Sequence, residues 1–195
     1  MATIRTPHAD SRLPKVLDEA ARLFRSRGFE GTSVREIAKA VGMLPGSLYC
    51  HFDTKEALLV AVYVKGVQQI TEAVRAAVDG VTDPWDRLEA ACVAHLEAIL
   101  RDDDYAQVVV RVRPADVPVA HQSLIELRNR YEALFTALVA ELPLGRGADR
   151  RILRLMLIGA MNSAQTWYRP GGRFNPRAIA RKFIALLRQG QEVPA

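Results

Sequence analysis

Residues 33–58 are SVREIAKAVGMLPGSLYCHFDTKEAL, and this stretch decides the fold. Ser33 and Glu36, three residues apart, have the form of a capping box, so we expect a helix to begin there. Gly42 suits the end of that short helix, and Pro45 suits the first turn of the next one. Two short helices joined by a turn that contains glycine are typical of a helix-turn-helix.

The second helix of this pair has the residue types that reading DNA requires. A helix that enters the major groove needs small or polar residues near its N-terminus, and Pro45-Gly46-Ser47 meet that need. Tyr49 and His51 suit flanking phosphates, while Leu48 and Phe52 are expected to face inward. The predicted DNA-contacting residues are Ser33, Arg35, Pro45, Gly46, Ser47, Tyr49, His51 and Lys55. On the residues alone, a plain packing corner between helices remains the alternative.

On both sides of this pair, apolar residues recur at helical spacing. A first helix is expected from about Leu13 to Gly28, and a long one after a second capping-box pattern at Asp53–Glu56. Later helices are expected from Asp83 through Ile99, from Asp102–Asp104, from about Val119 to Glu141, from Arg151 to Tyr168 and from Pro176 to Gln189. No strand pattern is present, so the predicted fold is all-α, with about nine helices.

Composition narrows the class of protein. The chain has 195 residues, a formal charge of +5 and 49% hydrophobic residues, which suits a globular protein and excludes extensive disorder. The charge invites a polyanion partner but does not establish one, since it is spread along the chain. No run of eighteen apolar residues exists and Met1–Asp10 lacks a signal-peptide core, so a cytoplasmic protein without a membrane partner is expected.

The sequence contains no pattern that indicates a metal, a cofactor or catalysis. The four histidines, at positions 8, 51, 95 and 121, have no metal-ligand spacing, and the acidic run Asp102–Asp104 is interpreted as a helix start. Nucleophile elbows, phosphate-binding glycine loops and paired cysteines are absent. Cys50 and Cys92 are expected to be reduced thiols. We therefore expect neither an enzyme nor a bound cofactor.

The segments 30–42 and 45–58 together resemble the N-terminal signature of TetR-family transcriptional regulators. The glycine turn, Leu-Tyr-x-His-Phe at residues 48–52 and Lys-Glu-x-Leu at residues 55–58 occur in register. The resemblance implies a homodimer that binds a near-palindromic operator, and a variable helical domain that binds a small ligand and releases the DNA. Leu44 departs from the family's usual capping Ser or Thr, and Cys50 from its usual aromatic residue or His.

This resemblance divides the chain into a DNA-binding domain, residues 1–54, and a ligand-binding and dimerisation domain, residues 55–195. The segment 152–167 is apolar around most of its circumference and contains small residues that permit close helix contact. The predicted dimer-interface residues are Gly159, Ala160, Ser163, Ala164, Ile179, Phe183 and Leu186. A core helix of a monomer is the alternative.

Trp167-Tyr168-Arg169-Pro170-Gly171-Gly172 resembles a motif between the last two helices of a subgroup of TetR regulators, some of which respond to acyl-CoA thioesters. An arginine suits the phosphates of coenzyme A, and an indole suits its adenine. The predicted ligand-binding residues are Trp85, His95, Arg111, Tyr131, Met156, Trp167, Tyr168 and Arg169. Three alternatives remain: a rigid loop that packs the dimer, a regulator of an efflux gene with another hydrophobic effector, and a helical binding protein without DNA activity.

Overall fold

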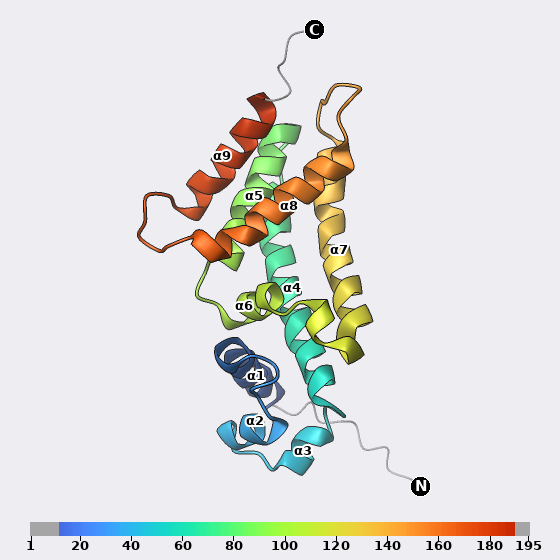
Figure 1. The fold of residues 1–195 in the computed structure, drawn as a ribbon, viewed down its shortest axis with the longest axis vertical. Helices are drawn as coiled ribbons and strands as arrows, with labels where there is room; N and C mark the ends of the chain where they lie inside the picture. Colours follow the sequence, from blue (N-terminus) through green and yellow to red (C-terminus); the bar gives the residue numbers. More distant parts are fainter. Residues whose placement is uncertain (1–11, 190–195) are drawn as a thin grey trace.

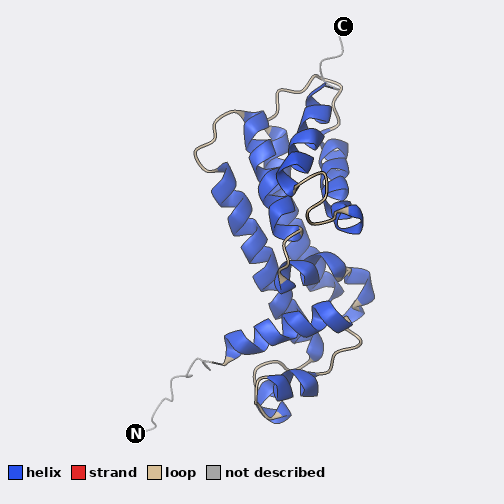
Figure 2. Ribbon diagram, turned by 90° about the vertical axis from the view of Figure 1, so that its left-hand side faces the viewer, coloured by secondary structure: helices blue, strands red, loops and turns tan. Residues whose placement is uncertain are grey.

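The computed structural model describes residues 12–189, and in this part of the chain helices joined by loops and turns are present without any strand (Figures 1 and 2). The predicted all-α fold is confirmed. The α-helices are α1 (Leu13–Arg27), α2 (Val34–Ala40), α3 (Pro45–Tyr49), α4 (Lys55–Val78), α5 (Pro84–Ile99), α6 (Asp104–Arg111), α7 (His121–Ala140), α8 (Arg150–Trp167) and α9 (Pro176–Gln189). Two 3-10 helices, η1 (Pro114–Asp116) and η2 (Pro118–Ala120), precede α7. The prediction for Met1–Asp10 lies outside the described residues.

Local signals set most helix ends. Gly28 ends α1 with a φ of 77°, a conformation that costs glycine little. The Ser33–Glu36 capping box is formed at α2. Asp83 caps α5 and Asp103 caps α6, as the sequence predicts. The expected second capping box is one residue out: Thr54, rather than Asp53, is the N-cap of α4, and its hydroxyl accepts from the N–H of Ala57 at 3.0 Å.

The N-terminal helices α1 to α3 form a small unit at the bottom of Figure 1. Its core contains Val16 and Phe24 of α1, Ile37 of α2 and Leu48 of α3, all buried. Burying side chains of this size contributes about 1.5–3 kcal/mol each, which fixes three short helices that would not be stable alone.

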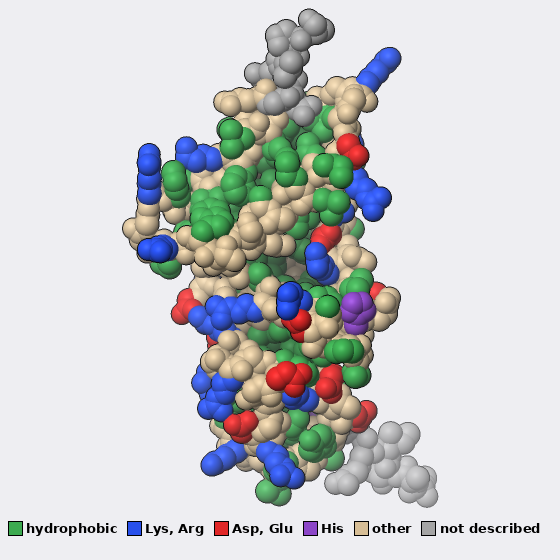
Figure 3. Space-filling view, in the orientation of Figure 1, with side chains coloured by type: hydrophobic (Ala, Val, Ile, Leu, Met, Phe, Trp, Pro, Cys, Tyr) green, Lys and Arg blue, Asp and Glu red, His purple; other side chains and the backbone are tan. Residues whose placement is uncertain are grey.

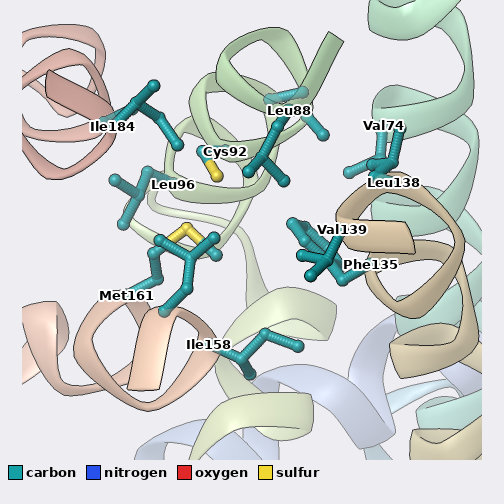
Figure 4. Packing of buried hydrophobic residues seen from close by; sticks show 14 of the residues in the cluster. Val74, Leu88, Cys92, Leu96, Phe135, Leu138, Val139, Ile158, Met161 and Ile184 are labelled. Atoms are coloured by element: carbon teal, nitrogen blue, oxygen red, sulfur yellow. The ribbon is translucent and has the colours of Figure 1, made fainter. Parts of the chain in front are cut away.

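The remaining helices pack around a second core, seen from close by in Figure 4. Phe135 and Val139 of α7 face Leu88 of α5, while Met161 of α8 lies beside Leu96 of α5. The core also holds Cys92, and burial raises the pKa of this thiol well above its usual range, so Cys92 is an inert apolar residue here.

Helix α4 joins the two cores. Its first half gives Leu58, Leu59 and Val62 to the N-terminal core, and its second half gives Ile70 and Val74 to the C-terminal core. By length and hydropathy alone, α4 is able to cross a membrane. Its apolar residues instead pack against α1, α5, α6 and α7, so packing within the protein accounts for the hydropathy of this helix.

Candidate DNA-binding surface and ligand cavity

The start of α2 is held in place by paired hydrogen bonds. The N–H of Glu36 donates to Oγ of Ser33 at 3.2 Å, and the N–H of Ser33 donates to the Glu36 carboxylate at 2.9 Å. The hydrogen bonds from Ser33 hold the pKa of Glu36 below its usual value. Arg27 of α1 pairs with the same carboxylate at 2.8 Å. Helix α2 is thereby fixed against α1, while Arg35 remains exposed.

Helix α3 is anchored on one side and exposed on the other. Leu48 is fully buried and Phe52 packs against the same core, as predicted. Gly46 and Ser47 are exposed, and Tyr49 exposes 46% of its surface. The N-cap residue Leu44 provides no side-chain cap, which confirms the expected departure. The arrangement presents the N-terminus of a short helix, clear of its own chain over residues 12–189.

The sequence prediction missed three features of this surface. Leu44 is 76% exposed at the start of α3. Lys39 is exposed in the last turn of α2. Lys55 is turned inward: its ammonium donates to the carbonyl of Phe29 at 2.9 Å and lies 4.1 Å from the centre of the Phe29 ring. The expected phosphate contact of Lys55 would therefore compete with an existing contact inside the chain.

A cavity of about 150 Å³ lies between α4, α5, α6, α7 and α8. Its walls are mainly apolar, and the lining residues include Val67 and Ile70 of α4, Ile99 of α5, Val109 and Val110 of α6, and Ile158 of α8. A mostly apolar cavity with a few polar groups is the usual form of a small-molecule site.

A hydrogen-bonded chain of three buried or half-buried side chains crosses the cavity wall. Nδ1 of His95 lies 2.6 Å from the hydroxyl of Tyr131, and Nε2 lies 3.1 Å from Oδ1 of Asn162. Burial lowers the pKa of His95 to about 4, so the ring is neutral near pH 7. With the amide oriented as here, Nε2–H donates to Asn162 and the Tyr131 hydroxyl donates to Nδ1.

Charged groups lie at the edge of the cavity. Glu132 of α7 pairs with Arg128 at 2.9 Å and also with Arg154 of α8. Arg113, which forms two 2.9 Å hydrogen bonds with Asp116, lines the same edge. Arg113 and Arg128 are both more exposed than buried, so their guanidinium groups can meet an anionic part of a ligand.

Of the predicted ligand-binding residues, the structure brings only His95 and Tyr131 to the cavity. Trp85 lies in the C-terminal core, because its side of α5 faces other helices. Met156 is exposed on the outer side of α8, and Arg111 is exposed at the end of α6. Trp167, Tyr168 and Arg169 line a separate shallow depression with Gly172, Arg173 and Phe174.

The cavity residues that the sequence prediction missed include Tyr63 and Asn162. Tyr63 lies four residues after Leu59 and four before Val67, which places all three on one face of α4. A tyrosine on such a face is a signal for a buried polar site, because its hydroxyl needs a partner.

Helix α6 connects the cavity to the N-terminal unit. Val109 and Val110 line the cavity, while Asp104 at the other end of the same helix pairs with Arg25 of α1 at 2.8 Å. The hydroxyl of Tyr105 donates to Asp18 of α1 at 2.6 Å. Helix α6 therefore contacts both the cavity and α1.

Lys65 of α4 completes this contact between helices. Its ammonium lies 3.0 Å from the Asp18 carboxylate and 2.9 Å from the Tyr105 hydroxyl. Next to it, Gly66 lets α4 approach α6 closely: a Cβ added there would lie 2.8 Å from the carbonyl oxygen of Tyr105 and 2.6 Å from a methyl of Val109.

An apolar face remains uncovered on α8 and α9. Ile152, Leu155 and Met156 of α8 and Leu186 of α9 are exposed, and Figure 3 shows hydrophobic side chains gathered over these helices. Gly159 and Ser163 are also exposed on α8, and Ala160 and Phe183 are half-buried.

Two of the predicted interface residues need correction. Ala164 is fully buried and Ile179 is 97% buried within the protomer, both in its own core. Neither has the surface that a contact with a second subunit requires.

Comparison with known proteins identifies the family. Residues 16–62 match the family described as bacterial regulatory proteins, tetR family, and residues 81–191 match the tetracyclin repressor-like C-terminal domain. The chain belongs to the TetR family. Its helix-turn-helix is therefore the DNA-binding domain that this family of transcriptional regulators shares.

Three relatives illustrate what this chain is similar to. The transcriptional repressor KstR2 of Mycobacterium tuberculosis (strain ATCC 25618 / H37Rv) is 30% identical over 188 residues, 93% of each chain. AibR, solved with isovaleryl coenzyme A and operator DNA, is 25% identical with a TM-score of 0.77, over 90% of this chain and 97% of that one. A structure described as the superantigen PfiT is 30% identical with a TM-score of 0.78, over 92% and 97% of the two chains.

Proposed function

We propose that this protein is a cytoplasmic transcriptional repressor that binds a near-palindromic operator as a homodimer and leaves it when a small hydrophobic effector, an acyl-CoA thioester, enters the cavity. The observation that carries the proposal is helix α6, which lines the cavity with Val109 and Val110 and pairs with α1 through Asp104. Half-sites on a duplex have a fixed spacing, so a shift of the recognition helices would cost operator affinity.

The proposed DNA contacts come from the exposed side of α2 and α3. Gly46 and Ser47 allow close approach to base edges, and Arg35 suits a base or a phosphate. Tyr49 and His51, with the backbone N–H groups at the start of α4, suit the flanking phosphates.

Replacing Tyr49 with phenylalanine is expected to weaken operator binding roughly 2- to 10-fold per half-site, because one phosphate hydrogen bond is lost. The sequence preference should not change, since a phosphate contact carries no base information. Quantitative footprinting on the operator and on scrambled duplexes measures both effects. Tyr168→Phe, on the C-terminal domain, is the matched control. An altered consensus site for Tyr49→Phe would show that this residue reads bases.

The proposed subunit interface is the uncovered apolar face of α8 and α9. Leu186 exposes 67% of its surface there, and an exposed apolar face is typical of a contact with another protein chain.

Leu186→Glu is expected to convert the dimer to monomers at micromolar concentration, because it buries a charge in an apolar contact. Sedimentation velocity measures the change, with Val119→Glu, at a residue that is 83% exposed and lies outside this face, as the control. If Leu186→Glu and Val119→Glu give the same proportions of monomer and dimer, the subunit interface lies elsewhere.

Two lines of evidence support an acyl-CoA effector over another hydrophobic compound. The cavity has apolar walls with Arg113 and Arg128 at its edge, and AibR, of the same fold, was solved with isovaleryl coenzyme A. Footprinting on genomic fragments, repeated with a panel of acyl-CoA thioesters, free fatty acids and efflux substrates, tests the proposal. A protected inverted repeat that only the thioesters release is the expected result. Release by a non-thioester alone would favour the efflux alternative.

A further inference from the structure

The cavity between α4 and α8 offers more hydrogen-bonding capacity than its own residues use. Tyr63 lines the cavity and is 97% buried, and within the described part of the chain its hydroxyl forms no hydrogen bond. Burial raises the pKa of this phenol, so the hydroxyl keeps its proton. Among the described residues, the buried side-chain polar atom without a partner is Nε of Arg87, so the Tyr63 hydroxyl is not shut off from solvent but opens into the cavity, where a polar atom of a ligand can pair with it. Its position indicates where a polar atom of a ligand would lie.

The chain formed by Tyr131, His95 and Asn162 adds a second polar position on the same wall. Tyr131 donates its only hydroxyl proton to His95, so its oxygen is left as an acceptor. Asn162 accepts from His95 through its carbonyl oxygen, so its amide N–H groups are left as donors. Together with Tyr63, the cavity presents both donors and acceptors to whatever it encloses. An alcohol oxygen can use both, and a ketone oxygen can use the donors.

The size of the cavity limits the enclosed group. An apolar cavity of about 150 Å³ holds one benzene ring, so a cavity of this volume encloses about six carbon atoms. Around the polar positions, the walls are branched aliphatic side chains such as Ile70, Val109 and Ile158. A long unsubstituted acyl chain is disfavoured twice, because it is too large for this space and leaves the polar groups unpaired.

We infer that the effector's enclosed group is a compact acyl group of about six carbons or fewer that carries a hydroxyl or keto oxygen, hydrogen-bonded by Tyr63 and by the Tyr131–Asn162 position. This inference rests on the proposed function, because it names the class of acyl group that the same cavity selects. Arg113 and Arg128 at the cavity edge then face the phosphates of the coenzyme A carrier.

Isothermal titration calorimetry on the full-length protein tests the inference. The probes are hexanoyl-CoA, 3-hydroxyhexanoyl-CoA, 3-oxohexanoyl-CoA and stearoyl-CoA, with free coenzyme A as the blank. At least one of the two oxygenated six-carbon thioesters is expected to bind about tenfold more tightly than hexanoyl-CoA, since one or two extra hydrogen bonds form in a buried site. Stearoyl-CoA is expected to bind most weakly.

The variant Tyr63→Phe separates selection by hydrogen bonding from selection by size. It is expected to remove most of the tenfold preference while leaving the affinity for hexanoyl-CoA unchanged, because only the hydroxyl is lost. Tyr168→Phe, outside the cavity, is expected to keep the full preference. Circular dichroism and operator binding of both variants establish that the fold and the DNA-binding domain are intact.

The outcomes distinguish this inference from the proposed function. Thioesters that all bind, without preference for the oxygenated six-carbon group or with stearoyl-CoA tightest, would overturn the inference and leave an acyl-CoA-responsive repressor. Tyr63→Phe with an undiminished preference would also overturn it. If no thioester binds but the operator is still protected, the acyl-CoA effector fails, and the inference fails with it. A preference for the oxygenated six-carbon thioesters that is lost in Tyr63→Phe supports both the inference and the proposed function.

Discussion

Gly66→Ala is expected to lower the free energy of unfolding by about 1–3 kcal/mol, although alanine normally stabilises a helix interior. The added Cβ would lie 2.8 Å from the carbonyl oxygen of Tyr105, and a backbone atom cannot move aside as a flexible side chain does. Helices α4 and α6 must therefore separate, which strains the contacts of Lys65 with Asp18 and Tyr105. For a chain of this size, a 2 kcal/mol loss lowers the melting temperature by about 4–8 °C.

Gly159→Ala is the matched control for this substitution. Gly159 is also inside a helix, but a Cβ added there meets nothing within 4 Å, so the change should stabilise by up to about 1 kcal/mol. Both variants are best measured by thermal unfolding in the Leu186→Glu background, which removes the proposed subunit contact. An equal gain in stability for Gly66→Ala and Gly159→Ala would show that α4 and α6 can move apart without a loss of stability.

Acidification from pH 7 to pH 5 is expected to lower the free energy of unfolding by about 2 kcal/mol through His95 alone. Its pKa is about 4 in the folded chain, because burial disfavours the charged ring, against 6.5 in the unfolded chain. The unfolded chain binds the proton more readily, so this stability is complete above pH 6.5, falls as the pH drops and is lost by about pH 4. The groups in contact with the ring are Tyr131, Asn162 and Phe135, and none of these is charged near pH 7.

Urea unfolding of the protein and of His95→Gln at several pH values measures this contribution. Glutamine keeps an amide for hydrogen bonding but does not titrate, so the variant should be less stable at pH 7 and nearly independent of pH between 7 and 5. Carboxyl groups with lowered pKa values, such as Glu36, lose their contribution only at still lower pH. The same slope in both proteins would assign the pH dependence to other groups.

Helix ends were predictable from the sequence because their causes are local. Ser33 and Glu36 need only each other, and Asp83 caps α5 through the N–H groups of Trp85 and Asp86, both at 2.9 Å. The exposed side of α3 followed from a short pattern in the same way, since Leu48 alone decides which side is buried.

The cavity was less predictable because it is the space that the side chains of five helices leave unfilled between them. Trp85 and Tyr63 both lie on largely buried helix faces, yet only Tyr63 borders the cavity. Periodicity identifies the buried face of a helix but does not say which opposing side chains leave a gap. The same limit applies to Lys55, whose partner, the carbonyl of Phe29, is 26 residues away.

The division of α4 between two cores bears on how this protein unfolds. Leu48 and Ile37 are buried partly against residues of α4, and that cluster also contains Tyr105, Val108 and Leu124 from the later sequence. Neither of the two segments that match a known family therefore contains all the residues of its hydrophobic core. We expect the described chain to melt in a single cooperative transition, and a fragment cut after residue 54 to remain unstructured in isolation.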